Sequence, residues 1–341
     1  MTKTAVILFN LGGPDSLDAV EPFLFNLFND PAIIGAPGLI RGVLARFISK
    51  KRGPVAREIY AQLGGKSPLV EETDKQARAL EAALGEGHRV FVAMRYWHPF
   101  AAEALAAAKA WGAERVVLLP LYPQFSTTTS RSSLREWRKL AAGWAVTTET
   151  VCCYPDEPGM VSAMADLVRA GFQRAAERGA PRILFSAHGL PQRVVDKGDP
   201  YPKHVEQTAR AVVGALGIAN VDWVVCYQSR VGPMKWIGPS TEEELERAGE
   251  DGVPVVVVPI AFVSEHSETL VELDIEYRHR AEALGIPAYV RVPAVGHHPD
   301  FINGLARLVR DPAALRGRGC AAAGQRCPFQ TEADSARGRD R

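Results

Sequence analysis

The 341-residue sequence has no long hydrophobic run, few cysteines and almost no net charge. No run reaches the ~18 apolar residues of a transmembrane helix, and the apolar stretch 5–9 is too short for a signal-peptide core. Forty basic and 39 acidic side chains leave a formal net charge of +1, which provides no global attraction for nucleic acid. We therefore expect a cytoplasmic protein whose electrostatic properties matter only locally.

Only five cysteines occur, at positions 152, 153, 226, 320 and 327. A small odd number in a chain of this length favours reduced thiols or metal ligation over a disulfide framework. Two common catalytic signatures are also missing, the His-Glu-x-x-His motif and a glycine-rich phosphate loop followed by lysine. These absences argue against a zinc protease of that type and against a P-loop enzyme.

Short apolar runs alternate with alanine-rich stretches along the chain, and 47% of the residues are apolar. Continuously apolar strands separated by helices are typical of a parallel sheet covered on both faces. The sequence therefore belongs to the α/β class. We predict amphipathic helices at 70–84 and 101–111 and strands at 5–9, 89–94, 115–119, 182–185, 223–227, 255–258 and 288–292.

A weak internal repeat indicates two similar lobes. The run 7–14 is similar to 183–191, and 116–121 is similar to 256–260, in the same order. We predict two Rossmann-like, doubly wound lobes, each a parallel four-stranded sheet flanked by helices, with the active-site cleft between them. We assign 1–157 to the first lobe, 158–312 to the second lobe and 313–341 to a C-terminal extension, with disorder expected from 331 onwards.

The segment 31–52 of the first lobe differs from its surroundings. Its apolar residues between 33 and 48 lie around Pro37 and Gly38, and Lys50, Lys51 and Arg52 follow them. An apolar face beside basic residues is typical of an element that lies on a membrane surface. An ordinary core helix with a solvated basic end explains the pattern equally well. We call residues 31–52 the lip.

Two segments of the second lobe carry titratable side chains directly after a predicted strand. The first strand runs into His188, then Gly189, at the sheet edge where ligands bind in open α/β folds. In the second segment Ser264 is a predicted N-cap, and Glu265, Glu268, Glu272 and Glu276 recur at helical spacing. A row of carboxylates raises its own pKa values and attracts cations, although such a row is more often a solvated helix face.

Aromatic and polar residues follow other strands. Such a set suits a flat apolar ligand with carboxylate edges, although each residue alone fits ordinary loop packing. The segments are Arg95 to Pro99, Tyr122 to Thr129 and Gln228 to Trp236.

Several long motifs, in order, resemble the ferrochelatase family from about residue 4 to 310. They are Leu184 to Pro191, the Gly-Asp-Pro-Tyr-Pro at 198–202, Gly232 to Trp236, and Pro259 to Phe262 with Glu268. The resemblance implies a two-lobed enzyme, a lyase that inserts Fe²⁺ into a porphyrin, releases two protons and needs no cofactor for the chemistry. Fe²⁺ is then a substrate, as the porphyrin is.

The resemblance also implies roles for individual residues. His188 and Glu268 match the family's catalytic and metal-binding pair, and Glu272 and Glu276 continue a route for metal or protons. His188 either accepts protons or binds iron. The implied porphyrin-binding residues, including those at strand ends and near the propionates, are Leu11, Lys51, Arg52, Ser67, Arg95, Tyr96, Tyr122, Ser126, Trp236 and Phe262.

The resemblance leaves the substrate and the cysteines open. Leu11 stands where some relatives have tyrosine and use coproporphyrin, so leucine favours protoporphyrin IX. The alternative substrates are coproporphyrin III or another tetrapyrrole. The alternative function is that of a porphyrin or haem carrier without catalysis. Many relatives hold a two-iron two-sulfur cluster with four cysteines. Here Phe329 stands where some relatives have a further C-terminal cysteine of that set. The possible ligands here are Cys152, Cys153, Cys320 and Cys327.

We expect no nucleic-acid partner and either a monomer or a homodimer. Peripheral contact with the inner face of a membrane through residues 33–48 is the remaining expectation about partners.

Overall fold

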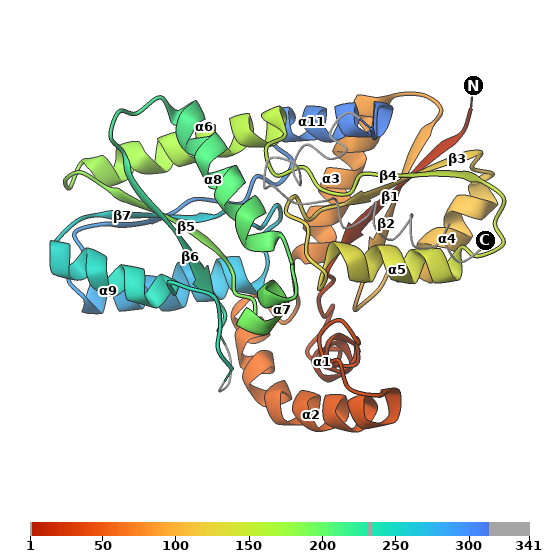
Figure 1. Ribbon diagram of the computed structural model, residues 1–341, viewed down its shortest axis with the longest axis horizontal. Helices are drawn as coiled ribbons and strands as arrows, with labels where there is room; N and C mark the ends of the chain where they lie inside the picture. The colour runs from red at the N-terminus through yellow and green to blue at the C-terminus, as the bar shows by residue number, and fades with distance from the viewer. Residues whose placement is uncertain (1, 231–233, 314–341) are drawn as a thin grey trace.

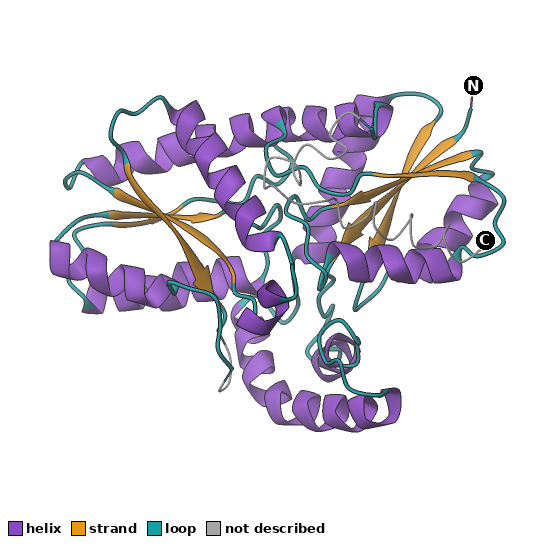
Figure 2. Ribbon diagram, in the orientation of Figure 1, coloured by secondary structure: helices purple, strands orange, loops and turns teal. Residues whose placement is uncertain are grey.

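The computed structural model describes residues 2–230 and 234–313. The expected disorder from 331 onwards, the extension that follows Ala313, and its cysteines Cys320 and Cys327 lie outside the described residues. The described chain forms two parallel four-stranded sheets with helices on both faces, as the sequence predicts (Figure 2).

The first sheet contains β1 (Thr4–Asn10), β2 (His88–Met94), β3 (Arg115–Pro120) and β4 (Thr147–Thr150), in the order β2-β1-β3-β4. The strand β1 lies between β2 and β3, and every one of its residues is buried. Its continuously apolar sequence is suited to this position, because helices cover both faces of a parallel sheet.

The second sheet repeats this arrangement with β5 (Arg182–His188), β6 (Asp222–Gln228), β7 (Val255–Pro259) and β8 (Tyr289–Arg291). Its order is β6-β5-β7-β8, so β5 has the place of β1 and β7 has the place of β3. The internal repeat in the sequence is therefore a structural repeat.

The strand list from the sequence was incomplete, because it omitted β4. This strand reads Thr-Thr-Glu-Thr and its first two residues are exposed at the edge of the sheet. An edge strand needs no continuous apolar run, so hydrophobic periodicity does not identify it.

Two helices connect the lobes. One buried cluster runs from Val6 and Val117 in the first sheet through α6 (Pro158–Ala176) and α11 (Pro299–Arg310) to Ile183 in the second sheet. The helix α11 also packs on α3 (Leu69–Leu84) of the first lobe. The two lobes therefore share a core. The remaining helices are α4 (Ala101–Trp111), α5 (Ser130–Leu140), α7 (Gln192–Asp196), α8 (Tyr201–Leu216), α9 (Thr241–Asp251) and α10 (Tyr277–Ala283).

The lip follows α1 (Val20–Phe28) and includes the first part of α2 (Gly38–Gln62). The helices α1 and α2 pack on each other below the sheets in Figure 1. Leu39, Val43 and Phe47 of α2 are 91%, 72% and 67% exposed. The start of α2 is therefore not an ordinary core helix, which was one of the two interpretations of its sequence. No helix in the described part of the chain is long and apolar enough to cross a membrane.

Candidate active site at the strand ends

The candidate site begins where β5 ends. His188 is the last residue of β5 and lies beside Gln228, the last residue of β6. A Cβ atom on the following residue, Gly189, would be 3.0 Å from the Gln228 carbonyl oxygen. Glycine therefore permits the chain to turn closely past β6. This turn leaves the His188 side chain 42% exposed.

His188 and Glu268 are in direct contact although 80 positions separate them. The His188 Nδ1 atom lies 2.8 Å from Glu268 Oε2. Glu268 is the first residue of a π-helix, η1 (Glu268–Glu276), and its side chain is 24% exposed. The π-helical conformation is rare and occurs frequently at functional sites. The structure thus brings His188 into contact with the acidic helix.

Glu272 lies behind this pair and is held by the chain that follows β6. The Ser229 amide donates to Glu272 Oε1 at 2.8 Å, and the Ser229 hydroxyl donates to Oε2 at 2.5 Å. The Gln228 side-chain amide donates to the same Oε2 at 3.1 Å. Ser229 has a φ of +60°, which aims its amide and hydroxyl in the direction of η1. Gln228 and Ser229 belong to the segment 228–236 that the sequence pointed to, because it directly follows a predicted strand, but neither was named among the individual site residues.

The pKa values of His188, Glu268 and Glu272 are shifted in different ways by their surroundings. Burial lowers the pKa of His188, but the adjacent Glu268 carboxylate, its hydrogen bond and Glu272 together raise it above the ordinary value. The pKa of Glu268 is lowered, because His188 and two further partners outweigh the effect of burial. Burial and the charge of Glu268 raise the pKa of Glu272. The site therefore holds an ionised carboxylate against a basic imidazole, with a second carboxyl that protonates more readily.

The beginning of the predicted acidic helix was wrong in two respects. The helix starts at Glu268, and the Ser264 hydroxyl donates to the Gln76 side chain instead of capping it. Glu265 leaves the carboxylate row and pairs with Arg291 at 2.6 Å. The sequence could not indicate these partners, because both come from distant elements. Glu276 is the last residue of η1 and is exposed.

Two aromatic residues of the predicted set, Trp236 and Phe262, follow the ends of β6 and β7. The Phe262 ring lies 4.6 Å from the ring of His266, a buried histidine whose pKa is lowered by burial. His266 was missing from the predicted residues. The backbone of Trp236 forms an isolated antiparallel β-bridge with that of Pro191. The Trp236 indole N–H has no hydrogen-bond partner in the described chain.

The first lobe contributes a second group of predicted residues near the end of β1. Leu11 packs against a cluster that includes Tyr60 and Tyr96. Burial raises the pKa of Tyr60 to about 12, against a hydrogen bond with Ser267, while the nearby Glu268 raises it further. The residue that precedes Glu268 therefore lies close to Tyr60 of α2. Ser67 is buried, and its amide donates to the Pro14 carbonyl.

Arg95 and Tyr96 are engaged with a buried carboxylate that the sequence did not single out. Arg95 Nη2 lies 2.8 Å from Asp30 Oδ2, and the Tyr96 hydroxyl donates to the same oxygen at 2.9 Å. The Ser132 hydroxyl also donates to Asp30. The Asp30 side chain is 2% exposed, so these partners replace the water that would otherwise solvate its charge.

We expect Asp30→Ala to lower the free energy of unfolding by roughly 3–5 kcal/mol, since removing one partner strands a buried charge. Chemical denaturation would measure the change. Asp166→Ala is the matched control, because it breaks an exposed ion pair with Arg169, which is worth about 0–1 kcal/mol. Equal losses of unfolding free energy in Asp30→Ala and Asp166→Ala would contradict the expectation that burial makes the Asp30 ion pair the more important one.

Four further predicted residues lie on α2 and after β3. Lys51 and Arg52 are exposed on α2, and the Arg52 guanidinium lies 5.9 Å from the Phe28 ring. Burial raises the pKa of Tyr122, so its phenol stays neutral. The Ser126 hydroxyl donates to Asp199 at 3.0 Å.

The cysteines fall into separate places. Cys152 and Cys153 are buried beside Phe125, after β4. Cys226 lies on β6 in the core of the second lobe, where its thiol donates to the Phe185 carbonyl. Cys226 therefore belongs to a different buried cluster from Cys152 and Cys153. In the described residues no three or more His, Cys, Asp and Glu side chains form a metal-holding cluster.

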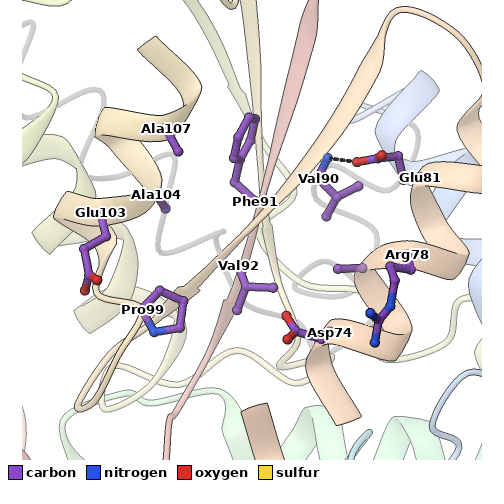
Figure 3. A pocket seen from close by; sticks show the side chains of 11 residues that line it. Asp74, Arg78, Glu81, Val90, Phe91, Val92, Pro99, Glu103, Ala104 and Ala107 are labelled. Atoms are coloured by element: carbon purple, nitrogen blue, oxygen red, sulfur yellow. Dashed lines mark hydrogen bonds between the residues drawn. The ribbon is translucent and has the colours of Figure 1, made fainter. Parts of the chain in front are cut away.

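Two pockets lie outside the His188 site. One, of about 460 Å³, opens between α3, β2 and α4, where the Glu81 carboxylate accepts from the Val90 amide at 2.8 Å (Figure 3). The other, of about 470 Å³, is bordered by Asp30 and Arg95. Neither His188 nor Glu268 lines them.

Comparison with solved structures defines the class of protein. The fold matches that of SirB from Bacillus subtilis with Fe³⁺, with a TM-score of 0.54 and 14% identity over 92% of this chain and 97% of that chain. It also matches a sirohydrochlorin chelatase from Bacillus subtilis subspecies spizizenii in complex with cobalt, with a TM-score of 0.51 and 13% identity over 92% and 97%. The two lobes therefore have the fold of chelatases.

Sequence relatives define the family within this class. The ferrochelatase family model matches residues 3–313. A ferrochelatase of Caulobacter vibrioides is 56% identical over 95% of each chain. One of Pelagibacter ubique is 47% identical over 90% of each chain. This chain belongs to the ferrochelatase family.

Proposed function

We propose that the protein inserts Fe²⁺ into protoporphyrin IX and releases two protons, the last step of haem biosynthesis. The observation that carries this proposal is the 2.8 Å contact between His188 and Glu268 at the carboxyl end of β5. Family membership supports the reaction, and the contact supports these two residues as its catalytic pair.

The charges of the site fit metal insertion. Two pyrrole nitrogens lose protons as Fe²⁺ binds all four, so the reaction needs a base on one side of the ring. His188 is exposed enough to reach a ligand and basic enough to accept a proton. Glu268 stabilises the imidazolium that forms, and Glu272 offers the next proton acceptor along η1. Glu276 continues this row to the surface.

The same residues are suited to admit iron. Carboxylate and imidazole groups both bind Fe²⁺. Because the site offers only a few such ligands, it holds the ion weakly enough to release it to the porphyrin. We assign Glu268, Glu272 and Glu276 to the entry route, with His188 as base or final ligand. A porphyrin or haem carrier needs no such row, which favours catalysis over transport.

We assign the porphyrin to the space between Leu11 on the first lobe and His188 on the second. The aliphatic side chain of Leu11, which is partly buried just after β1, suits the apolar vinyl edge of protoporphyrin. Lys51 and Arg52 on the exposed side of α2 are suited to propionates. The other residues that we assign to porphyrin binding are Ser67, Arg95, Tyr96, Tyr122, Ser126, Trp236 and Phe262.

Anaerobic assays of Fe²⁺ insertion into protoporphyrin IX and coproporphyrin III test this function. We expect faster turnover of protoporphyrin IX. A preference for coproporphyrin III would overturn the substrate, and turnover of neither porphyrin by the wild-type protein would overturn the reaction.

We also propose that the lip contacts a membrane of anionic lipid. The exposed apolar residues Leu39, Val43 and Phe47 recur every four residues on α2, and the exposed Arg46, Lys50 and Lys51 follow the same helix. An amphipathic helix of this kind buries its apolar face at the lipid interface while its basic residues attract anionic headgroups. The protein would then be cytoplasmic and peripheral at the inner membrane face.

We expect Phe47→Glu to weaken binding to phosphatidylglycerol vesicles by roughly tenfold, the loss expected for one buried aromatic side chain. Co-sedimentation measures the binding. Val55→Glu is the control, since Val55 is 61% exposed on α2 but outside the lip. Wild-type protein that ignores the vesicles would rule out the membrane contact.

The proposed reaction does not depend on an iron–sulfur cluster. The buried neighbours Cys152 and Cys153 could supply two thiolates, with Cys320 and Cys327 as the other two, whereas Cys226 is held in another core. Iron and acid-labile sulfide analysis of anaerobically purified protein decides between a bare and a cluster-bearing enzyme.

A further inference from the structure

Gln76 is a buried glutamine on α3 that connects the first lobe to the segment leading to Glu268. It is 1% exposed, and its side-chain amide donates to the Val263 carbonyl at 2.7 Å and to the Gly296 carbonyl at 2.8 Å. Its oxygen accepts from the Ser264 hydroxyl at 2.9 Å. Every hydrogen bond of this side chain therefore crosses between the lobes.

The segment held by Gln76 sits between β7 and η1. Val263 and Ser264 are five and four residues before Glu268, and the ring of the adjacent Phe262 contacts the His266 ring in a tilted arrangement. The segment is held from the other side by Arg291, which pairs with Glu265 at 2.6 Å. A displacement at Val263 would therefore be passed along a short buried stretch to the first residue of η1.

The helix α3 is also anchored to the opposite wall of the proposed site. The Asn10 side chain, at the end of β1, donates to the Thr73 hydroxyl at 3.0 Å. Thr73 lies one turn before Gln76 on α3. One face of α3 thus connects the end of β1, next to Leu11, with the loop that precedes Glu268.

We propose that Gln76 is a positioning residue for metal insertion: it sets the distance between the wall at Leu11 and the Glu268 end of η1. The proposal rests on the proposed function of His188 and Glu268 in the same reaction. Gln76 touches neither substrate in this account and acts through the Val263 to Glu268 segment.

Gln76→Leu tests the proposal, because leucine keeps the volume but makes none of the three hydrogen bonds. We expect kcat for the porphyrin that the wild type uses to fall roughly 10- to 100-fold, as small misplacements of catalytic groups do. The KM for porphyrin should stay close to the wild-type value. Ser264→Ala, which removes only one of the three bonds, should lower kcat less and decides the question if Gln76→Leu fails to fold.

The matched control is Gln207→Leu. Gln207 lies on α8, is partly buried and also bonds across the lobes, because its side-chain amide donates to Asp156 at 2.8 Å, but no hydrogen bond observed in the described chain joins it to the segment between β7 and η1. It should lose thermal stability and keep its kcat. Equal losses of kcat in both glutamine variants, or an unchanged kcat in Gln76→Leu, would overturn the proposal.

Amide hydrogen exchange provides a readout that needs no turnover. Exchange at 262–268 should accelerate in Gln76→Leu and stay slow in Gln207→Leu, whatever the substrate of the enzyme is. Unchanged exchange at 262–268 in Gln76→Leu would count against the positioning role. Absence of wild-type turnover, by contrast, would count against the proposed function.

Discussion

His188→Ala should reduce the rate of Fe²⁺ insertion by roughly 10²- to 10⁴-fold, the range for loss of a positioned general base. His188 is the only proposed base at the end of β5, and alanine leaves Glu268 without its partner. The thermal midpoint should change little, since the His188 side chain is 42% exposed. A stopped-time anaerobic assay with protoporphyrin IX measures the rate, and fluorescence quenching measures porphyrin binding.

The matched control for this variant is His279→Ala, which removes an exposed histidine on α10. It should retain wild-type turnover. If His188→Ala also turned over at the wild-type rate while binding porphyrin normally, His188 would have no catalytic role. A loss of porphyrin binding in parallel with the rate would make it a binding residue instead.

Glu268→Gln should both slow the reaction and move its pH dependence. Glutamine keeps the shape but removes the negative charge that raises the pKa of His188. A base must be unprotonated to accept a proton, so turnover in the wild type falls as the pH drops through that raised pKa. In Glu268→Gln the pKa of His188 falls, and the acid limb of the kcat/KM profile moves to lower pH.

The reduction in rate should again be roughly 10²-fold or more, because the imidazolium loses its counter-ion at the moment it forms. A pH series from about 5 to 9, anchored on the ordinary histidine value of about 6.5, measures the limb. Glu282→Gln on the exposed face of α10 is the control and should leave the profile unchanged. An acid limb that stays in place or moves to higher pH would contradict the assigned pairing.

The strand pattern and the repeat were readable from local sequence because buried parallel strands are continuously apolar. The runs beginning at Ala5 and Arg182 correspond to β1 and β5, which occupy the same place in their sheets. The edge strand β4 was not readable, since its four residues are polar and carry no apolar signal. The resemblance of long motifs to a known family identified His188 and Glu268 together.

Partners contributed by distant elements could not be predicted in the same way. Three contacts join residues from different elements. Glu265 pairs with Arg291, Arg95 pairs with Asp30, and the Ser264 hydroxyl donates to Gln76. Hydrogen bonding depends on the final backbone path, and the i to i+4 pattern of an acidic row is the same for a solvated helix and for a lined site.

By itself, the sequence determined the α/β class, the doubled lobe, the strand-end histidine and the family to which the motifs belong, because these depend on periodicity and on contiguous residues. Only the tertiary structure decided that the acidic helix is a π-helix starting at Glu268, that Ser229 holds Glu272, and that Gln76 joins the lobes. Those features arise from contacts between segments far apart in the chain, and folding alone brings such segments within hydrogen-bond distance.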